Sequence, residues 1–272
     1  HITIYGDYDI DGLTATTLLL DAFASFGFRH VDAFIPNRFV EGYGLTVEAV
    51  EKIAAAGATL IVTVDCGSLS REEIVRAGEL GVDVIVTDHH NVAQKQPPAV
   101  AVINPKRLLQ DFPEAYEGLV VRSDFATLSS DAVASSREVV LAKSQQSAEL
   151  AALKQSSIGL DSAKTTSGLG KAPSEVVAKS STELYPFLDL AGVGVAFKLV
   201  QALQTRLDGL GEGQEKWLLD LVALGTVCDV VTLRDENRAN VRWGLEVLRK
   251  TRRPGLRALM AVSRVKASEI DA

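Results

Sequence analysis

The chain has 272 residues, of which 47% are hydrophobic and 23% are charged, and its formal net charge at pH 7 is −7. This length suffices for one large domain or two modest ones with a hydrophobic core. A membrane-spanning helix is excluded because no run of about 18 apolar residues occurs. The two cysteines, Cys66 and Cys228, cannot form a disulfide framework, so we expect a reducing, cytoplasmic setting.

The beginning of the chain reads as the interior of a longer protein. It opens on His1 without an initiator methionine, and its one methionine is Met260. The first residues are strand-like and lack the features of a signal peptide. We therefore expect the sequence to be a fragment.

The first hundred residues alternate short β-rich runs with helical ones. Strands are predicted at 2–5, 31–35, 59–64, 82–87 and 99–103, and helices at 13–26, 46–56 and 70–78. Thr46 is a predicted helix cap. Such alternation predicts an α/β fold with a doubly wound, mainly parallel five-stranded sheet and helices on both faces.

The pattern changes after residue 107. Residues 108–184 are rich in serine and alanine and read as an insertion that is flexible or loosely helical, with one helix at 138–155. Further helices are predicted at 188–205, 214–224, 240–250 and 255–262. We expect a catalytic domain at 1–107 and 185–232, followed by a basic helical connector at 233–272.

Positive charge concentrates in that connector. Between Arg234 and Lys266 there are ten Lys or Arg and three Asp or Glu, so the segment carries +7 and the rest of the chain carries −14. This distribution fits a nucleic-acid-binding track beside a cluster of metal-binding carboxylates. A solvated helical face explains the charge alone equally well.

Acidic and histidine residues follow three of the predicted strands, in the motifs GDYDIDG (6–12), VDCG (64–67) and TDHH (87–90). Because ligands of open α/β sheets bind beyond the carboxyl ends of the strands, we expect the three motifs to converge there. Crowded carboxylates repel unless cations neutralise them, and with imidazoles they suit Mn²⁺, Mg²⁺ or Zn²⁺. Alone, the first motif is also typical of a calcium loop or a turn, and the histidine pair of a capping pair. Together they favour a two-metal site for displacement at phosphorus.

These motifs resemble the first three motifs of the DHH phosphoesterase superfamily and, within it, the RecJ-type single-stranded-DNA exonucleases. The resemblance extends to IPNR…EGYGL (35–45), INPKR (103–107), YPFLDLAGVGVAFKL (185–199) and GTVCDVV (225–231). It covers everything except 108–184. Two departures stand out: the insertion itself, and an end at Ala272, where RecJ-like proteins continue into a DHH-associated domain and an oligonucleotide-binding fold.

The resemblance implies a role for each site residue. The implied ligands of two Mn²⁺ or Mg²⁺ ions, with Asp65 bridging them, are Asp7, Asp9, Asp11, Asp65, His89 and Asp229. Asp65, His89 and His90 are the implied catalytic residues, with Asp88 supporting the ligands from behind. His90 and Arg238 would contact phosphate, although Arg238 could instead cap or pair within its helix.

The implied function is a cytoplasmic, monomeric exonuclease that degrades single-stranded DNA from 5′ to 3′ in repair and recombination. Its partners would be single-stranded DNA and other DNA-repair proteins, with no membrane. One alternative is a DHH phosphoesterase acting on short oligonucleotides, nucleotide bisphosphates or cyclic dinucleotides. Another is a non-catalytic DNA-binding relative.

Three features each have two interpretations. Residues 192–194 (GVG) form either a tight helix start or a phosphate cradle. Cys66 and Cys228 are either small buried fillers or Zn²⁺ ligands. Phe39 and Tyr43 either stack a nucleic-acid base or fill the core.

Overall fold

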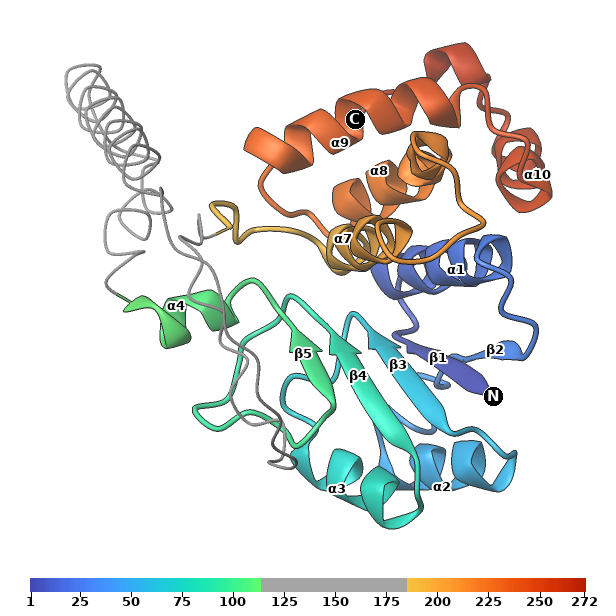
Figure 1. The fold of residues 1–272 in the computed structure, drawn as a ribbon. Coiled ribbons are helices and arrows are strands. Elements are labelled where there is room, and N and C mark those ends of the chain that lie inside the picture. Colours follow the sequence, from blue (N-terminus) through green and yellow to red (C-terminus); the bar gives the residue numbers. More distant parts are fainter. Residues whose placement is uncertain (114–184) are drawn as a thin grey trace, which may run out of the picture. The chain divides into compact units, whose positions relative to one another are not determined.

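The structure is a computed structural model that describes residues 1–113 and 185–272 (Figure 1). These two ranges form one compact unit. The helix expected at 138–155 and most of the expected insertion lie outside the described residues. The domain boundaries at 107, 185 and 233 remain predictions.

Five parallel strands form the sheet, in the order β2-β1-β3-β4-β5. They are β1 (Ile2–Gly6), β2 (Val31–Phe34), β3 (Leu60–Val64), β4 (Asp83–Thr87) and β5 (Ala101–Ile103). In the register of the central strands, Ile4 pairs with Ala33 on one side and Val62 on the other. The chain adds β2 on one side of β1 and then adds β3, β4 and β5 on the other side. The ligand crevice is therefore expected beyond the carboxyl ends of β1 and β3, where the order of the strands changes direction.

Helices connect and cover the strands. They are α1 (Ile10–Ser25), α2 (Val47–Ala55), α3 (Arg71–Glu79), α4 (Arg107–Asp111), α7 (Gly192–Gln204), α8 (Leu219–Cys228), α9 (Asp235–Leu248) and α10 (Pro254–Ser263), with the 3₁₀ turns η1 (Gln214–Leu218) and η2 (Ala267–Glu269). Among the described residues, no helix is long and apolar enough to cross a membrane.

Helix ends account for most differences from the predicted ranges. Helix α1 begins three residues early because the Asp9 side chain accepts a hydrogen bond from the Gly12 N–H, which caps the helix there. Thr46 caps α2 as predicted. The range 214–224 divides into η1 and α8, α9 starts five residues early, and the short α4 was not predicted.

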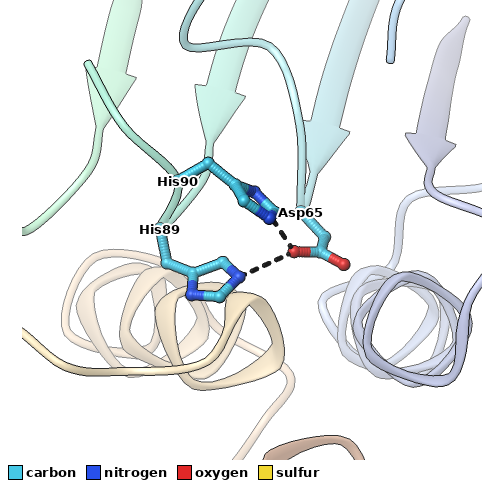
Figure 2. Close-up of side chains that lie close together, drawn as sticks. All are labelled: Asp65, His89 and His90. Atoms are coloured by element: carbon cyan, nitrogen blue, oxygen red, sulfur yellow. Dashed lines mark ion pairs between the residues drawn. The ribbon is translucent and has the colours of Figure 1, made fainter. Parts of the chain in front are cut away.

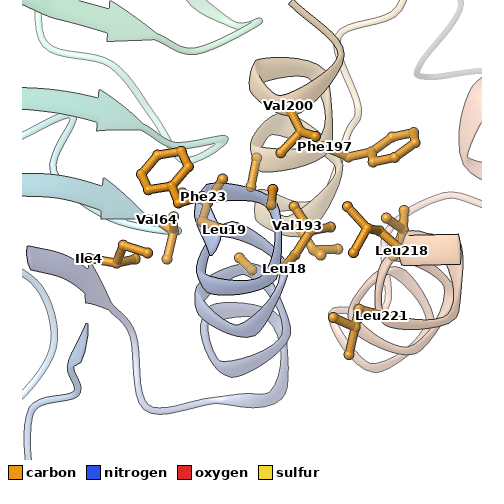
Figure 3. Packing of buried hydrophobic residues seen from close by; sticks show 14 of the residues in the cluster. Ile4, Leu18, Leu19, Phe23, Val64, Val193, Phe197, Val200, Leu218 and Leu221 are labelled. Carbon is orange, nitrogen blue, oxygen red and sulfur yellow. The ribbon is translucent and has the colours of Figure 1, made fainter. Parts of the chain in front are cut away.

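Two hydrophobic cores lie on opposite faces of the sheet, because successive strand residues point in opposite directions. On one face Ile4 and Val64 pack with Leu18 of α1 and Val193 of α7 (Figure 3). On the other, a cluster that includes Tyr5 packs with α2 and α3. Helices on both faces of a parallel sheet confirm the predicted fold class.

Helix α8 lies against α1 and α7, and α9 packs on α8. The approach of α9 is close at Gly244, where a Cβ atom would lie 2.2 Å from the carbonyl oxygen of Leu219. These contacts place the C-terminal end of α8 at the carboxyl edge of the sheet, where Asp229 follows the helix.

Candidate metal centre

The predicted ligands from the strand ends and from α8 converge at the carboxyl edge of the sheet. They come from the β1–α1 turn, the ends of β3 and β4, and the C-cap of α8. We call this set the Asp/His cluster: Asp7, Asp9, Asp11, Asp65, His89, His90 and Asp229. Its ligand atoms form three groups, each with all atoms within 4.8 Å of one another: Asp65–His89–His90, Asp11–His89–Asp229 and Asp7–Asp9–Asp65.

Asp65 lies at the centre of the cluster. Its Oδ1 atom is 3.0 Å from Nε2 of His89 and 3.8 Å from Nδ1 of His90 (Figure 2). Asp65 has a positive φ of 63°, which is uncommon for a residue other than glycine but tolerated by Asp and Asn. This backbone conformation aims the carboxylate into the cluster directly after β3.

The cluster fits a divalent cation. Asp65 Oδ1, His89 Nε2 and Asp229 Oδ2 are buried, and none has a hydrogen-bond partner among the described residues. A buried polar atom without a hydrogen bond costs about 1–3 kcal/mol, and a cation would satisfy all three atoms, of which only His89 Nε2 and Asp65 Oδ1 lie as close as 3.0 Å. Carboxylate oxygens combined with imidazole nitrogens are a donor set for Mn²⁺ or Mg²⁺.

Burial shifts the ionisation of the cluster. It raises the pKa of Asp11 to about 8, with a further contribution from the neighbouring charge of Asp65. It raises the pKa of Asp65 to about 9, reinforced by Asp9. Burial lowers the pKa of the His89 imidazole. Without a cation, the buried carboxyl groups therefore hold protons near neutral pH, and a bound cation would replace them.

Asp11 also anchors α7. Its Oδ2 accepts from the Gly192 N–H at 2.6 Å and its Oδ1 from the Val193 N–H at 2.9 Å. The residues 192–194 are thus a helix start whose N–H groups bind a carboxylate of the chain itself. These N–H groups, at the positive end of the helix dipole, offset part of the rise in the pKa of Asp11 that burial causes.

Two glycines make room for the cluster, and the sequence interpretation did not include them among the site residues. A Cβ atom on Gly192 would lie 2.7 Å from Asp65 Oδ1 and 2.9 Å from Asp11 Oδ2. One on Gly225 would lie 2.7 Å from Asp11 Oδ1. Both belong to blocks that carry the family resemblance, 185–199 and 225–231, and Gly192 also belongs to the GVG pattern at 192–194.

Asp88 orients the histidine pair. The buried carboxylate accepts from the N–H groups of Ser68, His89 and His90 and pairs with Nδ1 of His90 at 2.9 Å. Burial alone would raise the pKa of Asp88, but these hydrogen bonds outweigh it and lower the pKa to about 2. Because the Asp88 carboxylate accepts the proton of Nδ1, Nε2 of His90 is left for a ligand.

The structure decides between the two interpretations that were open for Phe39, Tyr43 and the cysteines where burial differs. The Tyr43 hydroxyl lies 3.1 Å from Nδ1 of His90 and 3.3 Å from the carbonyl oxygen of Asp65, and Phe39 is 91% exposed, so neither fills the core. Cys66 is buried, in keeping with a filler. Cys228 is exposed, so the filler interpretation is wrong for it. In the described ranges, neither cysteine joins a group that could hold a metal.

Arg238 lies exposed in the first turn of α9, and the described part of the chain gives it no ion pair. Its neighbour Asn237 is buried and donates to the carbonyl oxygens of Asp189 and Thr232. This fastens the start of α9 to the segment before α7. The phosphate role of Arg238 remains a prediction.

A doubly wound parallel sheet, with an Asp-rich turn after β1, an aspartate after β3 and a histidine pair after β4, defines the class of DHH phosphoesterases. In agreement, residues 1–122 match the N-terminal domain of the DHH family. Residues 1–122 therefore carry the N-terminal domain of this family.

Several relatives and solved structures that resemble this chain carry the name RecJ. Two of these relatives are named single-stranded-DNA-specific exonuclease RecJ. The one from Bacillus subtilis (strain 168) is 35% identical over 96% of this chain, and the one from Escherichia coli (strain K12) is 34% identical over 100% of it. The chain spans only 23% and 36% of their lengths. A crystal structure of exonuclease RecJ bound to manganese is 29% identical, with a TM-score of 0.60 over 98% of this chain and 49% of that one. RecJ from Thermus thermophilus in complex with Mn²⁺ is 27% identical, with a TM-score of 0.58 over 98% of this chain and 27% of that one.

Proposed function

We propose that this chain carries the nucleolytic centre of a RecJ-type exonuclease, which removes nucleotides from the 5′ end of single-stranded DNA in repair and recombination. The observation that carries the proposal is the convergence of three buried, unsatisfied ligand atoms, on Asp65, His89 and Asp229. The match to the DHH family and the RecJ relatives support the substrate.

The proposed ligands of two Mn²⁺ or Mg²⁺ ions are Asp7, Asp9, Asp11, Asp65, His89 and Asp229. Asp65 and His89 each belong to two of the three groups of ligand atoms, and of the two only Asp65 has a second oxygen with which to bridge two ions, which supports its role as the bridging ligand. When bound, such ions lower the pKa of a water molecule and neutralise charge on the phosphate during an in-line displacement. The two Mn²⁺-bound RecJ structures support the choice of metal.

The protein groups contribute positioning and positive charge. The hydrogen bond between His90 and Asp88 raises the pKa of His90, although burial opposes it. A protonated His90 held in this orientation can donate through Nε2 to a phosphate oxygen and stabilise the charge that develops there. The guanidinium fork of Arg238 is the proposed second phosphate contact.

The proposed setting follows from the substrate. Single-stranded DNA is the partner, the two unpaired cysteines fit a reducing cytoplasm, and the chain is proposed to act as a monomer. Contacts with other DNA-repair proteins belong to the same proposal.

Digestion of 5′-labelled single-stranded DNA with Mn²⁺ tests the function. Labelled mononucleotide is expected as the earliest product of the wild-type chain, and none is expected from Asp65→Asn. Asn is chosen as the replacement because it tolerates the same backbone conformation. Asp83→Asn is a matched control, because Asp83 is exposed at the opposite end of β4 and should release product normally. Release by Asp65→Asn would refute the site. Hydrolysis of cyclic dinucleotides or nucleotide bisphosphates, without release from DNA, would refute the substrate.

A further inference from the structure

The two tryptophans of the chain, Trp217 and Trp243, lie on one surface away from the Asp/His cluster. Their side chains are 63% and 60% exposed, which is unusual for indole rings. Both line a groove of about 760 Å³ between α7, η1 and α9. A second groove of about 700 Å³ shares Trp217, Val247 and Lys250 with the first, so the two adjoin. Exposed aromatic side chains gathered around a groove are typical of binding surfaces.

Positive charge surrounds the two indoles. Four exposed cations line the adjoining grooves: Lys216, Arg242, Lys250 and Arg252. None of them forms an ion pair with an acid in the described ranges. We call these four cations and the two tryptophans the tryptophan groove.

The acids that line the same grooves are already engaged. Glu215 is buried and accepts from Nε2 of Gln204 at 2.9 Å. Glu246 pairs with Arg249 at 2.7 Å. Asp220 is buried and accepts from Thr251 and Arg253, each at 2.9 Å. The free charge presented by the surface is therefore positive.

We propose that the tryptophan groove binds single-stranded nucleic acid, whose bases stack on Trp217 and Trp243 while the four cations hold its phosphates. Flat aromatic rings interleaved with cations are the recurring surface for single strands, because every base offers a face to stack and every nucleotide carries a charge. The Arg242 guanidinium lies over one face of the Trp243 ring, 6.0 Å from its centroid, so a cation that can hold a phosphate adjoins the ring and the other face is left for a base.

Helix α8 connects this groove to the cluster. It begins at Leu219, which lines the groove, and Asp229 of the cluster follows its last residue. Ten helical residues span about 15 Å, so one strand could contact both places. A strand bound in the groove would continue towards the metal centre. Only this continuation rests on the proposed function; binding in the groove does not.

Tryptophan fluorescence, excited selectively over tyrosine, tests the groove directly, because both tryptophans of the chain lie in it. We would titrate the chain with oligothymidylate in EDTA, which prevents cleavage, and repeat the titration with Trp217→Phe and Trp243→Phe. Quenching is expected in the wild type and in both variants, each reporting on the remaining indole. Trp243→Ala should weaken binding about fivefold or more.

Salt dependence identifies the role of the cations. The double variant Arg242→Gln, Lys250→Gln should bind more weakly, and the magnitude of its slope of log affinity against log salt should fall by about 1.4, or about 0.7 for each phosphate that is no longer neutralised. Arg29→Gln is the control, because Arg29 is exposed just before β2, at the amino ends of the strands. It should leave both quenching and slope unchanged.

Three outcomes would overturn the proposal: no quenching by oligothymidylate, an unchanged salt slope in the double variant, or quenching by polyglutamate alone, which would assign the surface to an acidic protein. Mononucleotide release is measured separately with Mn²⁺. Quenching without release would refute the nuclease and leave the groove, whereas release without quenching would refute the groove and leave the nuclease.

Discussion

The N–H of Gly192 donates a hydrogen bond of 2.6 Å to Oδ2 of Asp11, although the two residues are 181 positions apart in the chain. This contact joins the first turn of α1 to the first turn of α7 at the floor of the metal centre. A proposed metal ligand is therefore also the attachment point of a helix. The position of the Asp11 carboxylate therefore affects both the metal centre and the packing of α1 against α7.

Gly192→Ala is expected to disrupt the centre, because the added Cβ would lie 2.7 Å from Asp65 Oδ1. We expect Mn²⁺ affinity to fall tenfold or more, measured by calorimetric titration. Gly194→Ala is the control on the same helix, since the nearest neighbour of its Cβ would be the apolar side chain of Leu190, at 3.1 Å, and not a residue of the cluster. Its free energy of unfolding should change by no more than about 1 kcal/mol. Equal Mn²⁺ affinity in both variants would contradict this account.

Asp65→Asn should separate metal binding from folding. It removes a buried carboxyl group whose pKa is raised to about 9 and keeps a residue that tolerates the positive φ. Mn²⁺ binding should weaken at least tenfold, whereas the melting temperature without metal should be unchanged or higher. A large loss of metal-free stability, measured by thermal unfolding in EDTA, would show that the carboxylate is structural instead.

Without metal, stability should fall as the pH rises from about 4 to about 9. The folded pKa values of Asp11 and Asp65 lie above their unfolded values, so the folded state binds more protons in this window. His89 acts in the opposite direction below its ordinary pKa of 6.5, because its folded pKa is lowered. Denaturant unfolding in EDTA at several pH values measures the sum. Mn²⁺ should stabilise the protein most at high pH, where it competes with fewer protons.

Asp88→Asn should impair catalysis without removing a ligand. The amide cannot accept all four hydrogen bonds that Asp88 receives, so the orientation of His90 should be lost. Activity should drop about 10- to 100-fold. Single-turnover release of labelled nucleotide measures it, and activity equal to the wild type would exclude an orienting role for Asp88.

Arg253→Ala should destabilise the fold, because Arg253 is the partner of buried Asp220 and also pairs with Asp21 of α1. Leaving the Asp220 carboxylate unpaired should cost about 2 kcal/mol or more, even allowing for the partial exposure of Arg253. Exposed Arg252→Ala is the neighbouring control and should change the free energy of unfolding by no more than about 0.5 kcal/mol. Chemical denaturation distinguishes the two variants.

The sequence by itself determined the sheet and the convergence of the main motifs. Each strand was predicted within two residues of its observed bounds, because β-branched runs between turns have few other stable conformations. Parallel strands end at one edge, so the motifs after β1, β3 and β4 had to meet there. That Asp229 reaches them too was implied only by the family resemblance.

Only the tertiary structure decided the close contacts. The crowding at Gly192 and Gly225, the reach of Tyr43 to His90 and the exposure of the two tryptophans all depend on how α7, α8 and α9 pack. Periodicity identifies an apolar face but not the segment that covers it, because such contacts join residues far apart in the chain. The same packing raises the pKa of Asp11 and Asp65, since burial is a property of the folded chain rather than of any local motif.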